Sequence, residues 1–154
     1  MQFLEKIDVS TLEAEERDLV FTKFNDQTAL QFVTNVEALV NEHFQRPVAI
    51  RVILDHAILV DVMMIGRIDN KWIPRKINTV IATKHSSLSA YTKKISFKGM
   101  NDQTKYAICG GGFPLIINHQ IRGAFAVSGM KDHLDDHRLI VSAIHEILKS
   151  KGEE

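Results

Sequence analysis

Hydrophobic residues recur at helical spacing in three stretches of the chain, and each stretch predicts an amphipathic helix. The first begins after Asn25-Asp26, which we expect to cap it, and ends near Phe44. The second follows Asp69-Asn70 as its expected cap and ends near Lys84, and the third runs from Asp132 to about Ser150. Their stripes indicate core packing rather than a cofactor site: Ala29, Phe32, Val33, Val36 and Val40; Ile73, Ile77, Val80 and Ile81; Leu139, Ile140, Ala143, Ile144 and Ile147.

Two pairs of short apolar segments predict β-hairpins. Residues 47–54 and 57–64 are rich in β-branched side chains and too short for typical helices, so we expect paired strands that turn at Asp55-His56. Residues 115–117 and 121–127 form the second pair, with the polar Asn118-His119-Gln120 between them. Each pair therefore contributes two antiparallel strands.

The elements between these are shorter. Residues 11–16 predict a short helix with Ser10 or Thr11 as its cap. Residues 18–24 alternate only imperfectly and are expected to form an edge strand. The His85-Ser86-Ser87 stretch interrupts the helical pattern and is expected to cap a further helix over 88–97.

The order of these elements favours the α+β class. Hairpins joined through helices predict one mostly antiparallel sheet with helices packed on it. We expect residues 1–154 to form a single domain, because the length is typical of one and no linker or repeat is visible.

Composition limits the environment of the protein. Hydrophobic residues make up 45% and charged residues 25%, as in ordinary globular chains. The single Cys109 excludes an internal disulfide and fits a reducing compartment. Because the N-terminus lacks a signal-peptide pattern and no apolar run reaches membrane-spanning length, we expect a cytoplasmic protein without a membrane partner.

Charge is balanced overall but unevenly distributed. From Met1 to Asp26 acids outnumber bases seven to three, whereas residues 66–105 carry nine lysines and arginines against two aspartates. A basic segment in a neutral chain makes a local positive field that attracts anions. We expect a small anionic molecule as partner, and no nucleic acid.

The sequence Gly110-Gly111-Gly112-Phe113-Pro114 is the strongest candidate for a functional loop. Successive N–H groups of a glycine loop can form a concave nest for a phosphate or a carboxylate. The alternative is purely structural, a bulge or a tight bend at a corner of the sheet.

Basic side chains upstream complete the hypothesis of an anion pocket. Arg75 offers a planar fork for a carboxylate, Lys76 adds a point charge, and His85 can donate to the same anion. Trp72 lies beside the core stripe, where it can roof the pocket, meet another subunit or wrap the edge of the core.

Other chemistries find less support. The glycine run lacks the ending of a P-loop and the spacing of a dinucleotide fingerprint, and no zinc motif is present. Two alternatives stay open: Cys109 as a nucleophile with His85 or His137 as its base, and a metal site among Asp132, His133, Asp135, Asp136 and His137. The acids at this helix start also fit a simpler role as partners of the helix dipole.

Several motifs in order resemble a known family. Residues 69–76 (DNKWIPRK), His85-Ser86-Ser87, CGGGFPLII and the final SGM…DDHRLIVSAIHEIL are similar to an uncharacterised family of small proteins within the GlcG/HbpS-like haem-degrading domain superfamily. The resemblance covers nearly the whole chain. It implies a profilin-like sandwich, assembly into homo-oligomers, and association of relatives with haem or another small molecule.

Three functions follow as hypotheses. The first is an oligomeric protein that binds a small anion with Trp72, Arg75, Lys76, His85, Ser86, Gly110, Gly111, Gly112 and Phe113. The second is a haem-binding or haem-degrading protein, in which Arg75, Lys76 and His85 meet the propionates and iron while Met63, Met64 and Trp72 line the slot. The third is a structural module whose Trp72 and glycine loop serve subunit packing. Whether the protein is an enzyme stays open.

Overall fold

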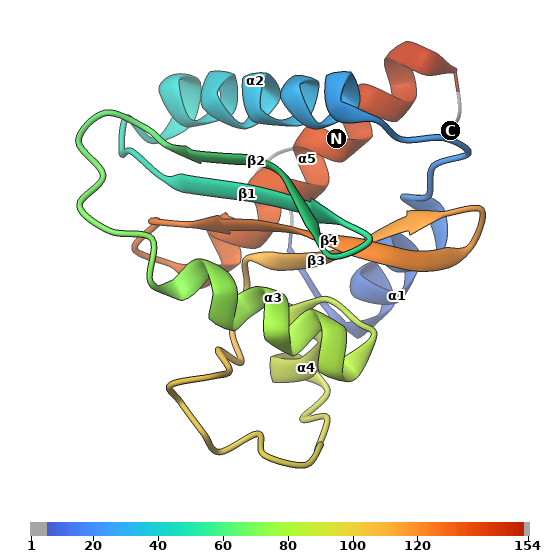
Figure 1. Cartoon of the computed structure of the whole chain (residues 1–154), viewed down its shortest axis with the longest axis vertical. Helices are drawn as coiled ribbons and strands as arrows, with labels where there is room; N and C mark the ends of the chain where they lie inside the picture. The colour runs from blue at the N-terminus through green and yellow to red at the C-terminus, as the bar shows by residue number, and fades with distance from the viewer. Residues whose placement is uncertain (1–5, 153–154) are drawn as a thin grey trace.

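The computed structural model describes residues 6–152 as one antiparallel sheet with helices on both of its faces (Figure 1). The helices are α1 (Val9–Asp18), α2 (Asp26–His43), α3 (Trp72–Thr83), α4 (Ser87–Thr92) and α5 (His133–Lys151). The strands are β1 (Ala49–Leu54), β2 (Ala57–Met63), β3 (Gly112–Ile117) and β4 (Gln120–Ser128). The α+β class and both predicted hairpins are confirmed.

The sheet has the strand order β2-β1-β4-β3, with every neighbouring pair antiparallel. Each hairpin turns through two residues with positive φ, Asp55-His56 in the first and Asn118-His119 in the second. This is the backbone of the type I′ turn, whose twist matches that of the strands it joins. The central strands of the sheet are β1 and β4, one from each hairpin, and they pair with each other. The centre of the sheet is therefore formed by two different halves of the chain.

The larger core lies between the sheet and the helices α2 and α5. Alternate residues of β4, Phe125 and Val127, point to this side and are fully buried. The ring of Phe125 packs against that of Phe32 from α2, with centroids 4.6 Å apart. Figure 1 shows α2 and α5 lying together across this face.

The opposite face of the sheet is built from small residues. Ala124 and Ala126 of β4 alternate with the large core residues and meet Ile73, Ile77 and Val80 of α3. Alanines leave room for a helix to approach closely, so α3 lies directly on β4 and β3 (Figure 1). The stripe predicted for this helix is buried at those three positions, whereas Ile81 is half exposed.

Several predicted ends differ from the structure. Helix α1 is capped by Asp8, whose side chain accepts from the Thr11 N–H, and not by Ser10 or Thr11. Helix α3 follows Lys71 without any side-chain cap, so the expected Asp69-Asn70 cap is wrong. The Asp69 carboxylate instead accepts from the Lys71 N–H.

The remaining differences concern short segments. The expected edge strand over 18–24 is reduced to a single parallel bridge of Phe21 with Ile117 on the outer side of β3. Helix α4 begins at Ser87 after the Ser86 cap, as predicted, but ends at Thr92 rather than 97. The Asn25 cap of α2 is confirmed, and α5 starts as predicted after Asp132, whose side chain caps it by accepting from the Leu134 N–H.

Gly123 offers a test of how closely β1 and β4 approach. A Cβ added there would lie 1.9 Å from the Ile53 carbonyl oxygen, which belongs to rigid backbone. We expect Gly123→Ala to lower the free energy of unfolding by at least about 3 kcal/mol, measured by urea denaturation.

The matched control is Gly152→Ala at the C-cap of α5, where φ is +70° and nothing lies within 4 Å of the added Cβ. It costs about 1–2 kcal/mol through backbone conformation alone. Equal effects of the two substitutions would contradict the close approach of the strands.

Candidate functional site

The three glycines pass between α3, β4 and the start of α5, where side chains do not fit. A Cβ on Gly110 would lie 2.2 Å from the His133 carbonyl oxygen, and one on Gly112 would lie 2.9 Å from that of Lys76. Gly111 has φ of +121°, and its Cβ would lie 2.5 Å from the Val127 carbonyl oxygen. The glycine triplet is therefore required by close packing of the backbone.

Two N–H groups of this loop donate within the protein. The Gly110 N–H donates to His133 Nδ1 at 2.8 Å, and the Gly112 N–H donates to Ser87 Oγ at 2.8 Å. The Gly111 carbonyl accepts from the Val127 N–H, which extends the β4 pairing into the loop. These bonds fit the structural interpretation of the glycines, the tight bend, better than a nest for an external anion.

A buried ion pair lies directly against Gly111. Lys76 Nζ donates to Asp136 Oδ2 at 3.1 Å and to the Val127 carbonyl at 3.0 Å, and the side chains are 3% and 5% exposed. The second oxygen of Asp136 accepts from the Met130 N–H. The pair thus joins α3, the end of β4 and α5 around the glycine loop.

Helical periodicity gave no reason to expect Lys76 in the core, and the sequence presented Asp136 as a partner of the helix dipole or as a candidate metal ligand. Burial raises the pKa of Asp136 above the usual aspartate range, against the opposing charge of Lys76. Burial also raises the pKa of the nearby Cys109 thiol.

An open pocket of about 310 Å³ adjoins this pair. It lies between the start of α3, the end of β4 and the start of α5, and its lining residues are Arg46, Arg67, Trp72, Lys76, Cys109, Ser128, Gly129, Met130, Lys131, His133 and Asp136. Four of the lining side chains are cationic and one is a carboxylate. The formal charge of the lining is therefore +3 with histidine neutral.

Of the residues proposed from sequence, the structure brings Trp72 and Lys76 together in this pocket. Arg75 instead lines a separate hollow with Lys71, Pro74, Asn78, Gln103 and Thr104. Its guanidinium lies 4.2 Å from the centre of the Trp72 ring and donates to the Gln103 carbonyl. The other positive charges in the pocket come from Arg46, Arg67 and Lys131, which periodicity gave no reason to select.

His85 and Ser86 dock helix α1 rather than line the pocket. His85 Nδ1 lies 2.7 Å from Glu16 Oε1, while the Ser86 N–H and the Ser89 hydroxyl donate to the second oxygen of Glu16. Phe113 is fully buried in the core. These positions do not converge with Lys76 on one surface.

A second histidine–glutamate contact repeats this docking from the other side. His137 is fully buried, and its Nε2 lies 2.7 Å from Glu15 Oε1. Consecutive glutamates of α1 are thus held by histidines from two distant segments. The sequence gives no signal of this pairing, because only the fold brings the two glutamates and the two histidines together.

The structure also bears on the metal site, on the Cys109 nucleophile and on subunit packing by the glycine loop. Among residues 6–152 no three His, Cys, Asp or Glu side chains are grouped so as to hold a metal ion. His85 and His137 have glutamate partners and are absent from the pocket lining that contains Cys109. The glycine loop is buried within the chain, so its proposed role in subunit packing has no surface to act through. No helix in this part of the chain is long and apolar enough to cross a membrane.

A family model, described as the haem degrading protein HbpS-like family, matches residues 24–145. The chain belongs to this HbpS-like family. It is also 36% identical to a UPF0303 protein of Edwardsiella ictaluri over 91% of this chain and 94% of that one, and 32% identical to one of Zymomonas mobilis over 89% and 77%. The resemblance noted from the sequence motifs is confirmed.

Solved structures agree with the fold. The crystal structure of Ybr137w protein has a TM-score of 0.83 at 26% identity and covers 97% of this chain and 92% of that one. A PduOC:haem complex has a TM-score of 0.66 at 22% identity, and HbpS has 0.68 at 15%; each covers 82% of this chain, and 94% and 91% of its own. At these lower identities the likeness shows the fold alone.

The family name implies haem, and the pocket meets its needs only in part. Cationic side chains for propionates are present, but neither His133 nor Cys109 of the lining is arranged as an axial ligand. His133 Nδ1 accepts from the Gly110 N–H, so in the neutral ring Nε2 carries the proton and has no free lone pair. The Cys109 thiol has a raised pKa, whereas iron is bound by the thiolate. These two side chains as arranged therefore do not fit haem iron.

The buried pair makes a pH-dependent prediction. Replacing Lys76 with Met leaves the Asp136 carboxylate buried without its cation, and we expect Lys76→Met to lose about 3–5 kcal/mol of stability at neutral pH. Without Lys76, burial holds the pKa of Asp136 still higher. Stability of the variant is therefore best when Asp136 is protonated, and it falls as pH rises above about 4, the usual aspartate value.

Urea denaturation across a pH series measures this effect. The double variant Lys76→Met/Asp136→Asn removes the charge but keeps an acceptor for the Met130 N–H, and we expect it to recover most of the loss without the added pH dependence. If Lys76→Met alone were as stable as wild type at neutral pH, the pair would contribute nothing to the stability of the fold.

Proposed function

We propose that the protein binds a small ligand with carboxylate or phosphate groups in the pocket beside the Lys76–Asp136 pair. The observation that carries this proposal is the charge of the lining, in which Arg46, Arg67, Lys76 and Lys131 stand against one lining carboxylate, Asp136. The Asp69 carboxylate lies outside the lining, 3.9 Å from the Arg67 guanidinium. Concentrated positive charge in a concave site raises the local concentration of anions and strengthens their binding.

The cationic hydrogen-bond donors lie at different depths in the pocket. An ammonium group has three N–H donors, and the contacts of Lys76 within the described residues use two of them. Because Lys76 also lines the pocket, the third donor is available to a ligand at its base. Arg67 and Lys131 supply charge nearer the opening, where Arg67 is steadied by its bond to the Asp69 carbonyl.

The pocket walls suit a compact ligand. Trp72 offers an aromatic surface, Met130 an adaptable apolar one, and the Ser128 hydroxyl a further polar contact. The volume of about 310 Å³ lies at the lower end of the range for small-molecule sites, about 300–1,000 Å³. A small polyanion with a short carbon skeleton matches these properties.

Thermal unfolding with citrate or inorganic phosphate tests the proposal, with sodium chloride at equal ionic strength as the baseline. We expect either anion to raise the Tm of wild type in a saturable manner, since a ligand of the folded state stabilises it by mass action. For a chain of this size each kcal/mol of binding raises Tm by about 2–4 °C.

The variants Arg67→Gln and Lys131→Gln should lose most of this shift. Arg75→Gln is the matched control, because Arg75 is a cation of α3 that lies outside the pocket lining although it contacts the lining residue Trp72. The proposal fails if the four proteins respond alike or if the shift equals that of chloride.

Haem is the second candidate, favoured by the family model and by the haem complex among the structural neighbours. In this pocket haem would be held through its propionates by Arg46, Arg67 and Lys131. Because neither His133 nor Cys109 is arranged as an axial ligand, we expect a haemin titration to give a Soret change that saturates, weakens in Arg67→Gln and persists in His133→Ala. A change that never saturates removes this candidate.

A further inference from the structure

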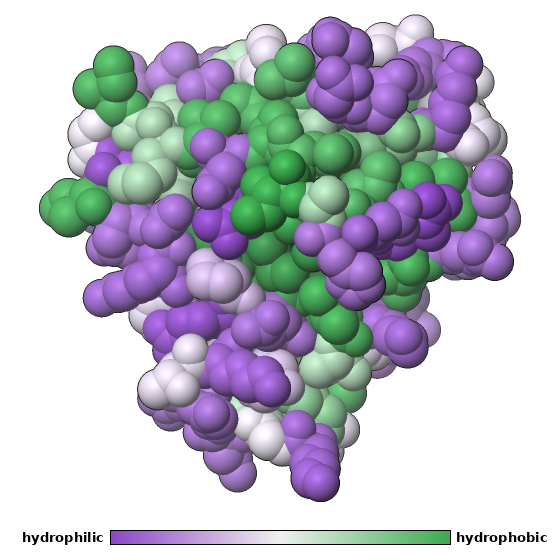
Figure 2. Space-filling model, in the orientation of Figure 1, coloured by the Kyte–Doolittle hydropathy of each residue, from purple (hydrophilic) through white to green (hydrophobic). Residues whose placement is uncertain are grey.

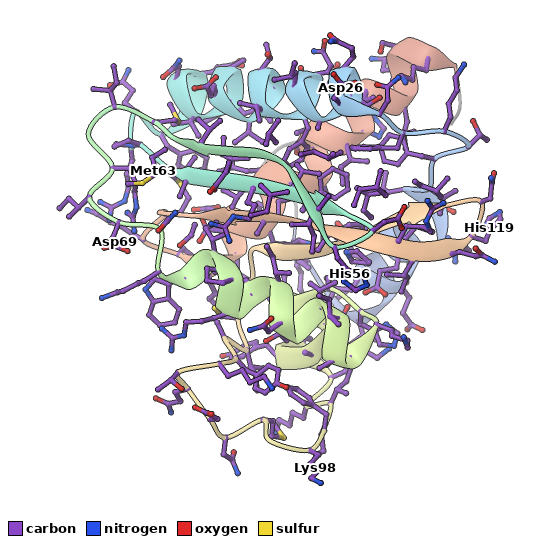
Figure 3. All side chains as sticks on the ribbon, in the orientation of Figure 1. Asp26, His56, Met63, Asp69, Lys98 and His119 are labelled. Carbon is purple, nitrogen blue, oxygen red and sulfur yellow. The ribbon has the colours of Figure 1, made fainter. Side chains whose placement is uncertain are left out.

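A second pocket lies at the end of α3 opposite to the candidate site. It has a volume of about 240 Å³ and lies between the end of α3, the β1–β2 turn and the start of β4. None of its lining residues belongs to the lining of the candidate pocket. Figure 3 labels His56, one of its lining residues, at the β1–β2 turn on the side of the sheet where α3 lies. A ligand of this pocket therefore binds apart from the anion proposed above.

The walls of this second pocket are hydrophobic. Ile53 of β1, Ile81 of α3 and Ile121 of β4 line it, and we call it the isoleucine pocket after these three residues. Ile81 and Ile121 are 49% and 40% exposed. Figure 2 shows hydrophobic surface between the β1–β2 hairpin and α3, with hydrophilic residues at its border. Exposed apolar side chains in a hollow favour binding of an apolar group, because their burial removes apolar area from water.

The charged groups of the isoleucine pocket leave one cation without a counterion. Arg122 and Asp55 neutralise each other, because the guanidinium donates to both carboxylate oxygens, with Nε 2.8 Å from Oδ1. Lys84 also lines the pocket, and among the described residues it has no ion-pair partner. Two cations and one carboxylate give the lining a formal charge of +1 with His56 neutral. An anionic group beside the isoleucines complements this charge.

The backbone at Lys84 also indicates a specific role for its side chain. Lys84 follows the last turn of α3 with a φ of +61°, a left-handed conformation in which glycine is usual because it has no Cβ. Helix α5 has Gly152 at the corresponding position. In α3 a lysine occupies it at a conformational cost, and unfavourable backbone conformations of this kind recur at binding sites. The lysine places an ammonium group at the isoleucine pocket where glycine fits the helix end better.

We propose that the isoleucine pocket binds a short-chain aliphatic carboxylate. The hydrocarbon chain lies against Ile53, Ile81 and Ile121, and the carboxylate pairs with Lys84. The volume of about 240 Å³ is below the range of about 300–1,000 Å³ typical of small-molecule sites, so the pocket suits a short chain rather than a full-length fatty acid. The assignment rests on this pocket alone and does not depend on the anion proposed for the candidate site.

Calorimetric titration of the full chain with a series of carboxylates tests the proposal, with acetate as the carboxylate that has almost no chain. We expect octanoate to bind saturably, and hexanoate and butyrate to bind progressively more weakly, because each buried CH₂ group raises the affinity by up to about fourfold. Octylammonium has the same chain length and the opposite charge, and it should bind at least about fivefold more weakly than octanoate.

Proton–nitrogen correlation spectra of wild type locate the bound octanoate. The amides of residues 53–56, 81–84 and 121–123 should shift during the titration, since these segments line the isoleucine pocket. Amides around Arg67 and Lys131 belong to the candidate pocket and should stay unchanged. The spectra therefore separate this site from the anion site proposed above.

Two variants test the named contacts. Lys84→Gly removes the ammonium and suits the left-handed backbone, so it should keep or raise the Tm while weakening octanoate binding by about threefold to fivefold. Ile81→Asp places a negative charge in the lining at a half-exposed position and should weaken binding by at least about tenfold. Lys94→Gly is the matched control, because Lys94 is also a lysine with positive φ, of 53°, and lies outside this lining. It should bind octanoate as wild type does.

Equal affinities of Lys84→Gly and Lys94→Gly for octanoate overturn the pairing with Lys84, and octylammonium that binds as tightly as octanoate overturns the anionic class. The proposal as a whole fails if affinity does not rise with chain length, or if only amides around Arg67 and Lys131 shift. Circular dichroism establishes whether Ile81→Asp is folded. If it is not, the spectra of wild type and the comparison of the two glycine variants decide the outcome.

Discussion

The contact of Lys76 with Asp136 is the interaction on which the arrangement of the site depends. It joins a helix from one face of the sheet to the first turn of the helix on the other face, past the end of β4. Burying two charges is expensive, and the cost is met here by their pairing together with hydrogen bonds to the Val127 carbonyl and the Met130 N–H. A Cβ on Gly111 would lie 2.5 Å from the Val127 carbonyl oxygen and equally close to the lysine Nζ that donates to it, so the position beside the pair requires glycine.

Helix α1 is likewise held in place by polar contacts between segments that are distant in the sequence. Glu15 and Glu16 are consecutive, and they reach His137 of α5 and His85 before α4. Ser87 then connects the start of α4 to Gly112, so the docking of α1 and the path of the glycine loop share one hydrogen-bonded region. The motif residues that resemble a ligand site in the sequence thus serve largely to hold the loop, and they leave the pocket to residues around them.

The loop that follows β2 carries both a wall of the pocket and exposed hydrophobic side chains. Arg67 of this loop lines the pocket, whereas Ile65 and Ile68 are exposed to solvent.

Much of the fold was determined by local pattern. Helical stripes such as Phe32–Val36 and Ile73–Ile77, the β-branched runs of β1 and β2, and the polar turns at Asp55 and Asn118 each agree with the structure because they depend on spacing and turn chemistry within a few residues. The caps at Asn25 and Asp132 are local in the same sense.

The site was decided by tertiary structure. Whether Lys76 is buried depends on Asp136, sixty positions away. Whether the N–H groups of the glycine loop are free to bind a ligand depends on how closely α3 and α5 approach the loop. Arg46, Arg67 and Lys131 carry no motif, and only the packing of three separate segments makes them one pocket. The sequence by itself determined the elements and the family, whereas the partners of each polar side chain follow from long-range contacts that no local pattern encodes.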